Sequence, residues 1–252
     1  MKKLSFTYEM SLAFDKPVKN HSFILIGYPQ NTPMQRVYDL SIKVFPNTEL
    51  SESCDAFGNK ILSGRINGEH NTFGFKASGT VFAEQPKITA EELQTFYKYP
   101  SRYTEWGENL ECFYRDIPLT GEASFWMNRL FENFQYVKDM TTVKTTADEA
   151  MKIRKGVCQD YSHILIALLR HNKIPARYVS GFIPGEGETH AWVEYHDGNG
   201  WIGLDPTHNC FVDDKYIKLA VGRDFGDCIL NKGIFQGTAL QTQKISVKVD
   251  MV

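Results

Sequence analysis

The 252-residue chain has no long hydrophobic run, no closely paired cysteines and no marked excess of charge of either sign. Its longest apolar stretch near the centre, residues 164–169, is far too short to span a bilayer. The N-terminal residues alternate apolar and polar side chains and lack a small-residue cleavage site, which predicts that no signal peptide is present. A formal net charge of −2 gives no indication of nucleic acid or a membrane as a partner.

The cysteines are few and scattered. They are odd in number and lie in unrelated segments: Cys54, Cys112, Cys158, Cys210 and Cys228. This pattern fits a reducing compartment better than a disulfide framework. The sequence therefore predicts a cytoplasmic protein without disulfides.

The first third of the chain has the pattern of β-strands. Leu4, Phe6 and Tyr8 alternate with polar residues, and turn residues separate several such runs. Asn67-Gly68 between two apolar runs predicts a tight hairpin turn. We expect a small all-β sandwich domain over residues 1–85.

The composition changes near Gln85-Pro86, and helical periodicity follows. Residues 90–100 and 120–137 are predicted helical, with an ordered loop between them, and Thr146 with Glu149 forms a capping box. A helix with one apolar face is predicted from Cys158 to about residue 171. Beyond Pro175 the period becomes two. Helices followed by strands predict an α+β domain over residues 86–252, with helices packed on an antiparallel sheet.

Three residues of this second domain suggest nucleophilic chemistry. Cys158 lies where a helix begins, and the partial positive charge of a helix N-terminus stabilises a thiolate. His190 opens one predicted strand, and Asp205 closes the next. A thiol, an imidazole and a carboxylate can act as nucleophile, base and orienting group. For Cys158 alone, a buried and inert cysteine is the competing interpretation.

The turn at residues 197–200 predicts that the strands of His190 and Asp205 pair. We expect the two residues near opposite ends of that ladder. A metal site is the rival use of these residue types, since Asp160, His163 and His208 are also available. The chain has no C-x-x-C pair and no H-E-x-x-H, so we predict no metal.

Four sequence blocks resemble the transglutaminase-like superfamily, in particular its bacterial, cysteine-protease-like branch. They are GVCQDYSH from Gly156, IPAR at residues 174–177, HAW from His190 and LDPTHN ending at residue 209, in the family's order. The N-terminal region resembles the family's accessory domain through DAFGN at residues 55–59.

This resemblance implies a papain-like core preceded by an accessory β domain. It implies Cys158 as nucleophile, His190 as base and then acid, and Asp205 as the orienting carboxylate. Tyr136 lies upstream of the cysteine in a segment suited to an oxyanion donor, and Trp192 is a candidate substrate contact. The family usually has Gly before the Ile-Pro-Ala-Arg block. This chain has Lys173 there, so we expect Asn172 to take the left-handed conformation.

The implied reaction is acyl transfer on an amide of a peptide or protein substrate through a thioester, without a cofactor. Hydrolysis is the favoured outcome, and amine transfer by a protein-glutamine transglutaminase is the alternative. Both reactions share the same three side chains, so the sequence does not separate them. A non-catalytic module that binds peptides or proteins is the rival from another class, although such a module would be expected to lose one of the three residues.

Overall fold

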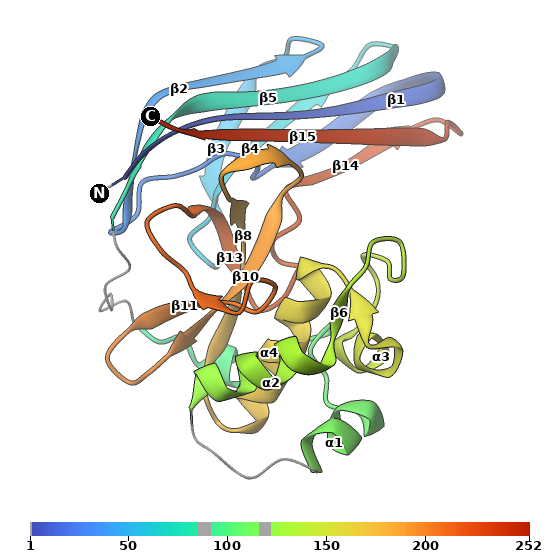
Figure 1. Ribbon diagram of the computed structural model, residues 1–252. Coiled ribbons are helices and arrows are strands. Elements are labelled where there is room, and N and C mark those ends of the chain that lie inside the picture. Colours follow the sequence, from blue (N-terminus) through green and yellow to red (C-terminus); the bar gives the residue numbers. More distant parts are fainter. Residues whose placement is uncertain (1, 85–91, 116–121) are drawn as a thin grey trace.

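The computed structural model describes residues 2–84, 92–115 and 122–252 (Figure 1). Its helical elements, in chain order, are η1 (Thr95–Lys98), α1 (Glu108–Arg115), α2 (Ala123–Asn133), α3 (Ala147–Ile153) and α4 (Cys158–His171). Its strands before α4 are β1 (Lys2–Leu25), β2 (Gln35–Phe45), β3 (Leu50–Cys54), β4 (Lys60–Ile66), β5 (His70–Ala83), β6 (Gln135–Tyr136) and β7 (Lys155–Gly156). Its strands after α4 are β8 (Ala176–Phe182), β9 (Gly185–Gly187), β10 (His190–His196), β11 (Trp201–Asp205), β12 (Cys210–Phe211), β13 (Ile217–Gly222), β14 (Asn231–Gln236) and β15 (Gln241–Met251).

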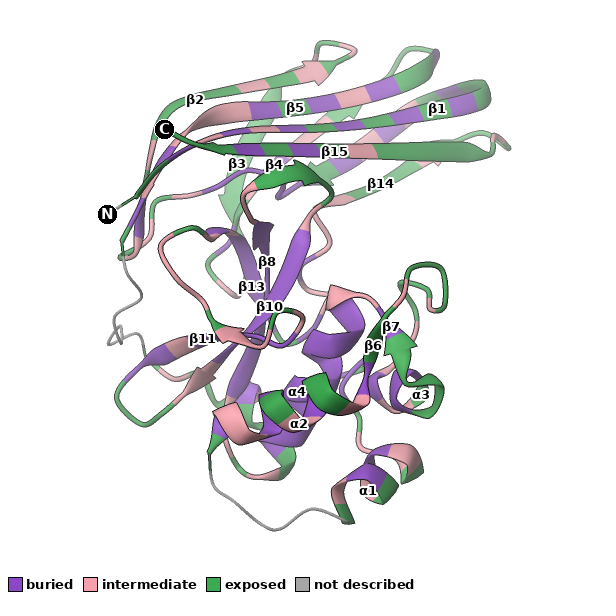
Figure 2. Ribbon diagram, in the orientation of Figure 1, coloured by how far each residue is buried: buried purple, intermediate pink, exposed green. Residues whose placement is uncertain are grey.

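The long strand β1 organises an eight-stranded sheet. Its first half pairs with β5 and β15 in the order β2-β5-β1-β15-β9, and its second half pairs with β4 and β14. The two halves share one core: the rings of Phe23 and Phe73 are 4.7 Å apart, and those of Phe14 and Phe235 are 5.0 Å apart. This arrangement follows from strict alternation, since every second residue of β1 from Leu4 to Phe14 is buried (Figure 2).

The last strands of the chain belong to this sheet. β15 pairs antiparallel with β1 over eleven residue pairs, from Leu4–Met251 to Phe14–Gln241. β9, within the second predicted domain, pairs with β15. The predicted boundary at residue 85 lies outside the described residues, and it does not separate the sheet from the rest, because strands from both ranges build it. Local periodicity cannot show such long-range pairing.

The second part has helices packed on an antiparallel sheet, as the α+β prediction expected. The five strands follow the order β12-β11-β10-β8-β13. α4 packs on this sheet with Ile164, Leu165 and Leu168 fully buried in a core shared with α2 and α3. Figure 1 shows the helices gathered around α4, away from the eight-stranded sheet.

Two side-chain amides join the two parts. β13 is an edge strand, and Gln35 bonds to both backbone groups of Lys218 at 2.8 and 2.9 Å. Asn59 does the same at Val221, with both bonds at 2.8 Å. These amides take the place of a neighbouring strand and satisfy a buried sheet edge. The resembling block that ends at Asn59 thus has a docking role.

Several predicted elements differ from the structure. The helix predicted up to residue 100 is a short 3₁₀ turn, Thr95–Lys98, although residues 90 and 91 lie outside the described residues. The predicted loop before residue 116 contains α1, and α2 ends at Asn133 instead of continuing to residue 137. Tyr136 leaves the helix because it pairs with Gly156 in the short sheet of β6 and β7. Tertiary pairing overrides helical propensity there.

Two turn predictions are also wrong. The turn at Asn67-Gly68 joins β4 and β5, yet these strands do not pair with each other, because each pairs with a different half of β1. After α4, Lys173 takes the left-handed conformation (φ 64°), whereas Asn172 (φ −81°) does not. Asn172 instead bonds back to the carbonyl of Leu168 through its side chain at 2.8 Å.

Candidate active site

Cys158 is the first residue of α4, and Asp160 fixes the backbone at the start of this helix. Asp160 Oδ2 accepts the backbone N–H of Val157 at 2.8 Å and the hydroxyl of Thr141 at 2.7 Å. Gly156 is needed because a Cβ there would lie 2.3 Å from the same oxygen. In the first turn of α4 the N–H of Asp160 bonds to the carbonyl of Val157 at 2.9 Å, whereas Cys158 and Gln159 have no preceding helical carbonyl to bond, so the helix start suits an oxyanion or a thiolate.

His190 and Asp205 are carried by one antiparallel hairpin. β10 and β11 pair through the turn at residues 197–200, with His196 opposite Trp201 and Val193 opposite Leu204. This register places Asp205 opposite Trp192, so His190 and Asp205 lie at the same open end of the ladder. The prediction that the strands pair is confirmed, whereas the expectation of opposite ends is wrong.

The ring of His190 connects the other two groups. Its Nε2 lies 2.8 Å from Asp205 Oδ2, in a pair whose side chains are 8% and 0% exposed. Cys158 acts on the same ring, and this interaction also favours the imidazolium form of His190. Burial alone would lower the pKa of His190, but the bonds to Asp205 and Cys158 outweigh it and raise this pKa to about 9. His190 is therefore predominantly imidazolium near neutral pH.

Asp205 has more partners than the sequence indicated. His208 Nδ1 lies 2.7 Å from Oδ2, and the hydroxyl of Tyr216 donates to the same oxygen at 2.8 Å. Burial would raise the pKa of Asp205, but its hydrogen bonds from His190, His208 and Tyr216 hold this pKa well below its usual range. The position of His208, three residues after Asp205 in the Asp-Pro-Thr-His block, could have predicted its contact with Asp205. No feature of the sequence near Tyr216 predicts the contact of its hydroxyl.

Among the residues that the structure describes, one group of three potential metal ligands lies within 4.8 Å, namely His190, Asp205 and His208. The hydrogen bonds from both imidazoles to Asp205 account for this closeness. Asp160 and His163, the other residues weighed as ligands, serve the fold instead. His163 accepts the backbone N–H of Phe225 at 3.1 Å and stacks on Tyr103.

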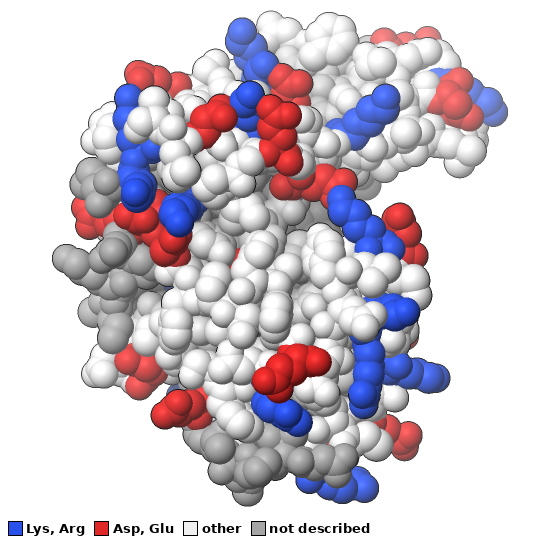
Figure 3. All heavy atoms as spheres, viewed as in Figure 1, with Lys and Arg blue, Asp and Glu red and all other residues white. Residues whose placement is uncertain are grey.

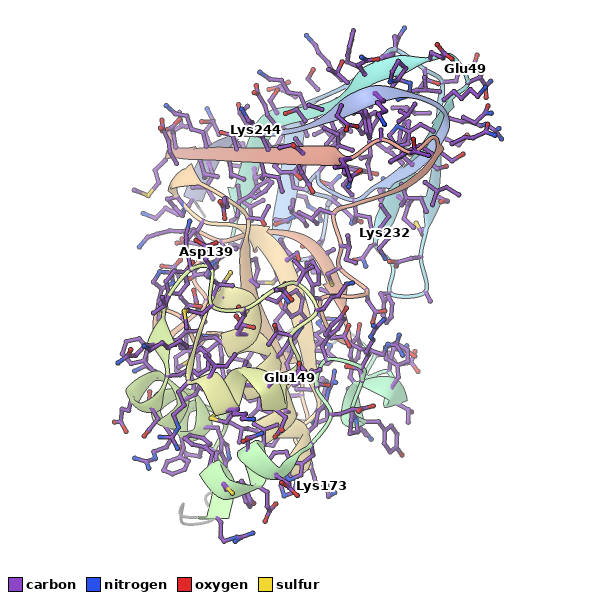
Figure 4. The ribbon with its side chains drawn as sticks, turned by 90° about the vertical axis from the view of Figure 1, so that its right-hand side faces the viewer. Glu49, Asp139, Glu149, Lys173, Lys232 and Lys244 are labelled. Atoms are coloured by element: carbon purple, nitrogen blue, oxygen red, sulfur yellow. The ribbon has the colours of Figure 1, made fainter. Side chains whose placement is uncertain are left out.

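A cleft of about 860 Å³ opens over Cys158. Its walls include the segment from Tyr136 to Val143, the segment from Ile183 to Ala191, and β15 with Gln243, Ile245 and Val247. In Figure 4, Asp139 marks the first wall and Lys244 lies on β15 across the gap. Figure 3 shows the hollow from the side, with acidic and basic side chains both near its rim.

Tyr136 and Trp192, the candidate oxyanion donor and the candidate substrate contact, differ in their access to this cleft. Tyr136 lines it and is 48% exposed. Partial burial and the nearby charges of Cys158 and Glu188 raise the pKa of Tyr136, which keeps its hydroxyl protonated. Trp192 is 1% exposed, packs with Val179 and Val221, and does not line the cleft. Because this side chain is buried and does not line the cleft, we correct that expectation: the Trp192 ring lies beside that of His190, with their centroids 6.4 Å apart.

All five cysteines are free thiols. Within residues 2–84, 92–115 and 122–252, no helix is long and apolar enough to cross a membrane.

Comparisons with known proteins agree with this architecture. Residues 116–206 match the family described as the transglutaminase-like superfamily, and residues 4–82 match the bacterial transglutaminase-like N-terminal region. A solved structure described as "a Putative Cysteine Protease from Cytophaga hutchinsonii" superposes with a TM-score of 0.81 at 24% identity, covering 100% of this chain and 91% of that one. This likeness shows the fold.

Sequence relatives extend over different lengths. An uncharacterized Mycobacterium leprae protein is 26% identical over 251 residues, 88% of each chain. An uncharacterized Mycobacterium tuberculosis protein is 36% identical over 151 residues, and the match covers 54% of this chain but only 48% of that protein. A protein-glutamine gamma-glutamyltransferase of Pseudomonas aeruginosa is 37% identical over 68 residues, 22% of this chain and 10% of that protein. With both regions matched and the fold shared, the chain belongs to the transglutaminase-like superfamily.

Proposed function

We propose that this protein is a cysteine-dependent enzyme that cleaves amide bonds of a peptide or protein through a thioester on Cys158. The observation that carries the proposal is the ring of His190, which lies 2.8 Å from Asp205 and whose pKa is raised by Cys158 as well as by that carboxylate. Nucleophile, base and orienting group thus act on one another in the order that this chemistry requires. The superfamily supports cysteine acyl transfer or proteolysis in general.

In the first step the thiolate of Cys158 attacks the amide carbonyl carbon, and the carbonyl electrons move to oxygen. We place the oxyanion at the start of α4, because Cys158 and Gln159, whose N–H groups can donate, line the cleft together with Tyr136. The imidazolium of His190 then gives its proton to the leaving nitrogen. Ammonia or an amine departs as the C–N bond breaks, and a thioester on Cys158 remains.

In the second step a nucleophile resolves the thioester. For hydrolysis, His190 takes a proton from water, the hydroxide attacks the thioester carbonyl, and the acid and the Cys158 thiolate are released, with His190 again protonated. We favour this outcome because the cleft is open to solvent on the side of His208, which is half exposed. If a primary amine enters instead, the same steps give an amide, as in a protein-glutamine transglutaminase. The chemistry needs no cofactor.

The two outcomes are separable with one pair of probes. We would incubate the protein with dimethylcasein and dansylcadaverine, then measure protein-bound fluorescence, released ammonia and new peptide termini. Hydrolysis predicts ammonia or new termini without bound fluorescence, whereas transfer predicts bound fluorescence. Cys158→Ala abolishes either signal, while Cys112→Ala, which changes an exposed cysteine on α1, keeps it.

The alternative function, a module that only binds peptides, is tested by the reactivity of the Cys158 thiol. Iodoacetamide is expected to alkylate Cys158 near pH 7 faster than a free model thiol, because the imidazolium of His190 stabilises the thiolate. The alkylated site is read by mass spectrometry on the peptide that contains it. A Cys158 that reacts no faster than the model thiol, together with no Cys158-dependent activity on any amide probe, refutes the catalytic proposal.

A further inference from the structure

The carboxylate of Asp205 is bonded unequally at its two oxygens. Oδ1 accepts two backbone N–H groups of the following turn, from Thr207 at 2.9 Å and His208 at 3.3 Å. Oδ2 accepts three side-chain donors: His190 at 2.8 Å, His208 at 2.7 Å and Tyr216 at 2.8 Å. Of these donors, His190 is the one whose pKa is raised by Cys158 as well as by Asp205.

Two facts follow from this geometry. A carboxylate oxygen offers about two lone-pair sites, so three donors on Oδ2 compete for its negative charge. The position of the carboxylate does not depend on that competition, because the backbone bonds at Oδ1 and the complete burial of Asp205 hold it. The side chains of His208 and Tyr216 are therefore not required to hold the Asp205 carboxylate in place.

We propose that Tyr216 and His208 weaken the Asp205–His190 hydrogen bond by sharing the same oxygen, and thereby set how tightly His190 holds its proton. Both are positioning residues that act through Asp205 and touch no reacting atom. The significance for catalysis rests on the proposed function, since His190 must stay protonated beside the thiolate and then release that proton to the leaving group. If Oδ2 of Asp205 accepted a hydrogen bond from His190 alone, His190 would hold its proton more tightly and release it less readily.

The surroundings of His190 support this role. The titratable groups that face His190 and its partner are Cys158 of α4, Asp205 of β11, His208 of the turn, and Tyr216 and Cys210 beside Asp205, with Tyr136 and Glu188 across the cleft. Lys138 also lines the cleft, where it pairs with Glu188 at 3.9 Å. Among the described residues, the printed partners of Asp205 include no lysine or arginine. Burial and the charge of Asp205 raise the pKa of Tyr216, so its hydroxyl remains a donor over the working pH range.

The test is the pH profile of alkylation at Cys158 by iodoacetamide, followed by mass spectrometry from about pH 4 to pH 10. The lower step of the profile reports formation of the thiolate–imidazolium pair, and the upper step reports loss of the imidazolium proton. For Tyr216→Phe we expect the lower step to move to lower pH and the upper step to higher pH, each by roughly half a pH unit. The reason is that the charge-assisted bond between Asp205 and His190 becomes stronger when one competing donor is removed. Steps that move together or stay unchanged overturn the proposal, since Tyr216 would then act as an anchor or not at all.

A second variant and two controls keep the test decisive. His208→Ala removes the other donor from a half-exposed site and is expected to move the steps in the same direction, even if Tyr216→Phe does not fold. Tyr195→Phe and His196→Ala change the same residue types on β10, away from Asp205, and are expected to leave both steps in place.

Failure of this inference differs from failure of the proposed function. A wild-type profile with a single step, like that of a free thiol, overturns both, because no ion pair exists to be adjusted. A wild-type profile with two steps that Tyr216→Phe and His208→Ala do not separate further overturns only the role of these two residues.

Discussion

Asp205→Asn is the substitution that tests the electrostatics of the site most directly. The side chain keeps its size and its place in the turn, but the negative charge beside His190 is lost. Hydrogen bonds to Asp205 and Cys158 raise the pKa of His190 from 6.5 to about 9 against the opposing effect of burial. At about 1.4 kcal/mol per pH unit, this rise corresponds to about 3 kcal/mol in favour of the imidazolium form.

Without the carboxylate, Cys158 alone opposes the lowering effect of burial, and the pKa of His190 is expected to fall. The imidazolium fraction at pH 7.5 is then expected to decrease. We expect alkylation of Cys158 by iodoacetamide at pH 7.5 to slow by about tenfold or more, because the thiolate loses its counter-charge. The assay is the alkylation rate as a function of pH, read by mass spectrometry on the peptide that contains Cys158.

Asp197→Asn is the matched control, because Asp197 lies on the same hairpin at its closed end and bonds to the N–H groups of Asn199 and Gly200. An asparagine can accept those bonds, so the alkylation profile is expected to remain that of the wild type. The reasoning is refuted if Asp205→Asn leaves the profile unchanged while circular dichroism shows a folded protein.

Three further predictions concern stability. Gly156→Ala places a Cβ 2.3 Å from the carboxylate that holds the start of α4, and it is expected to cost about 1–3 kcal/mol in urea unfolding, whereas Gly68→Ala, with no atom within 4 Å, costs little. Arg170→Met leaves buried carbonyl and hydroxyl groups without their donor and is expected to cost about 3–5 kcal/mol, so a loss below about 1 kcal/mol contradicts it. The raised pKa of His190 stabilises the folded state fully below pH 6.5, and this contribution disappears as pH rises through about 9. The urea midpoint should therefore fall more steeply over that range in the wild type than in Asp205→Asn.

Much of the site was predictable because its signals are local. A helix start is encoded within one turn, and the Thr146–Glu149 capping box is present with both of its reciprocal bonds. The alternation of apolar and polar residues after Pro175 predicts the strands, and the turn at residues 197–200 predicts that the strands of His190 and Asp205 pair. The three candidate residues lie together for these reasons, while their catalytic roles stay predictions.

The parts that the sequence did not predict depend on pairing between distant segments. No pattern near Tyr216 indicates that its hydroxyl reaches Asp205, because β13 is placed beside β8 only by the sheet order. The expectation that His190 and Asp205 lie at opposite ends had a different cause. The turn at residues 197–200 was predicted correctly, and it already places both residues at the ends of their strands that lie away from the turn.

The same long-range pairing decides what the N-terminal region contributes. β9 lies directly before His190 in the chain, and it pairs with β15, which pairs with β1. One wall of the cleft is thus the edge of the eight-stranded sheet, and Gln35 and Asn59 fix that sheet to β13 through paired amide bonds. β13 in turn pairs with β8, whose residues Ser180 and Tyr178 line the cleft, so the side-chain amides of Gln35 and Asn59 join the N-terminal sheet to the sheet beneath the candidate nucleophile. The N-terminal region therefore supports the cleft, and its removal would leave β15, which forms one wall and holds β9 before His190, without its partner strand β1.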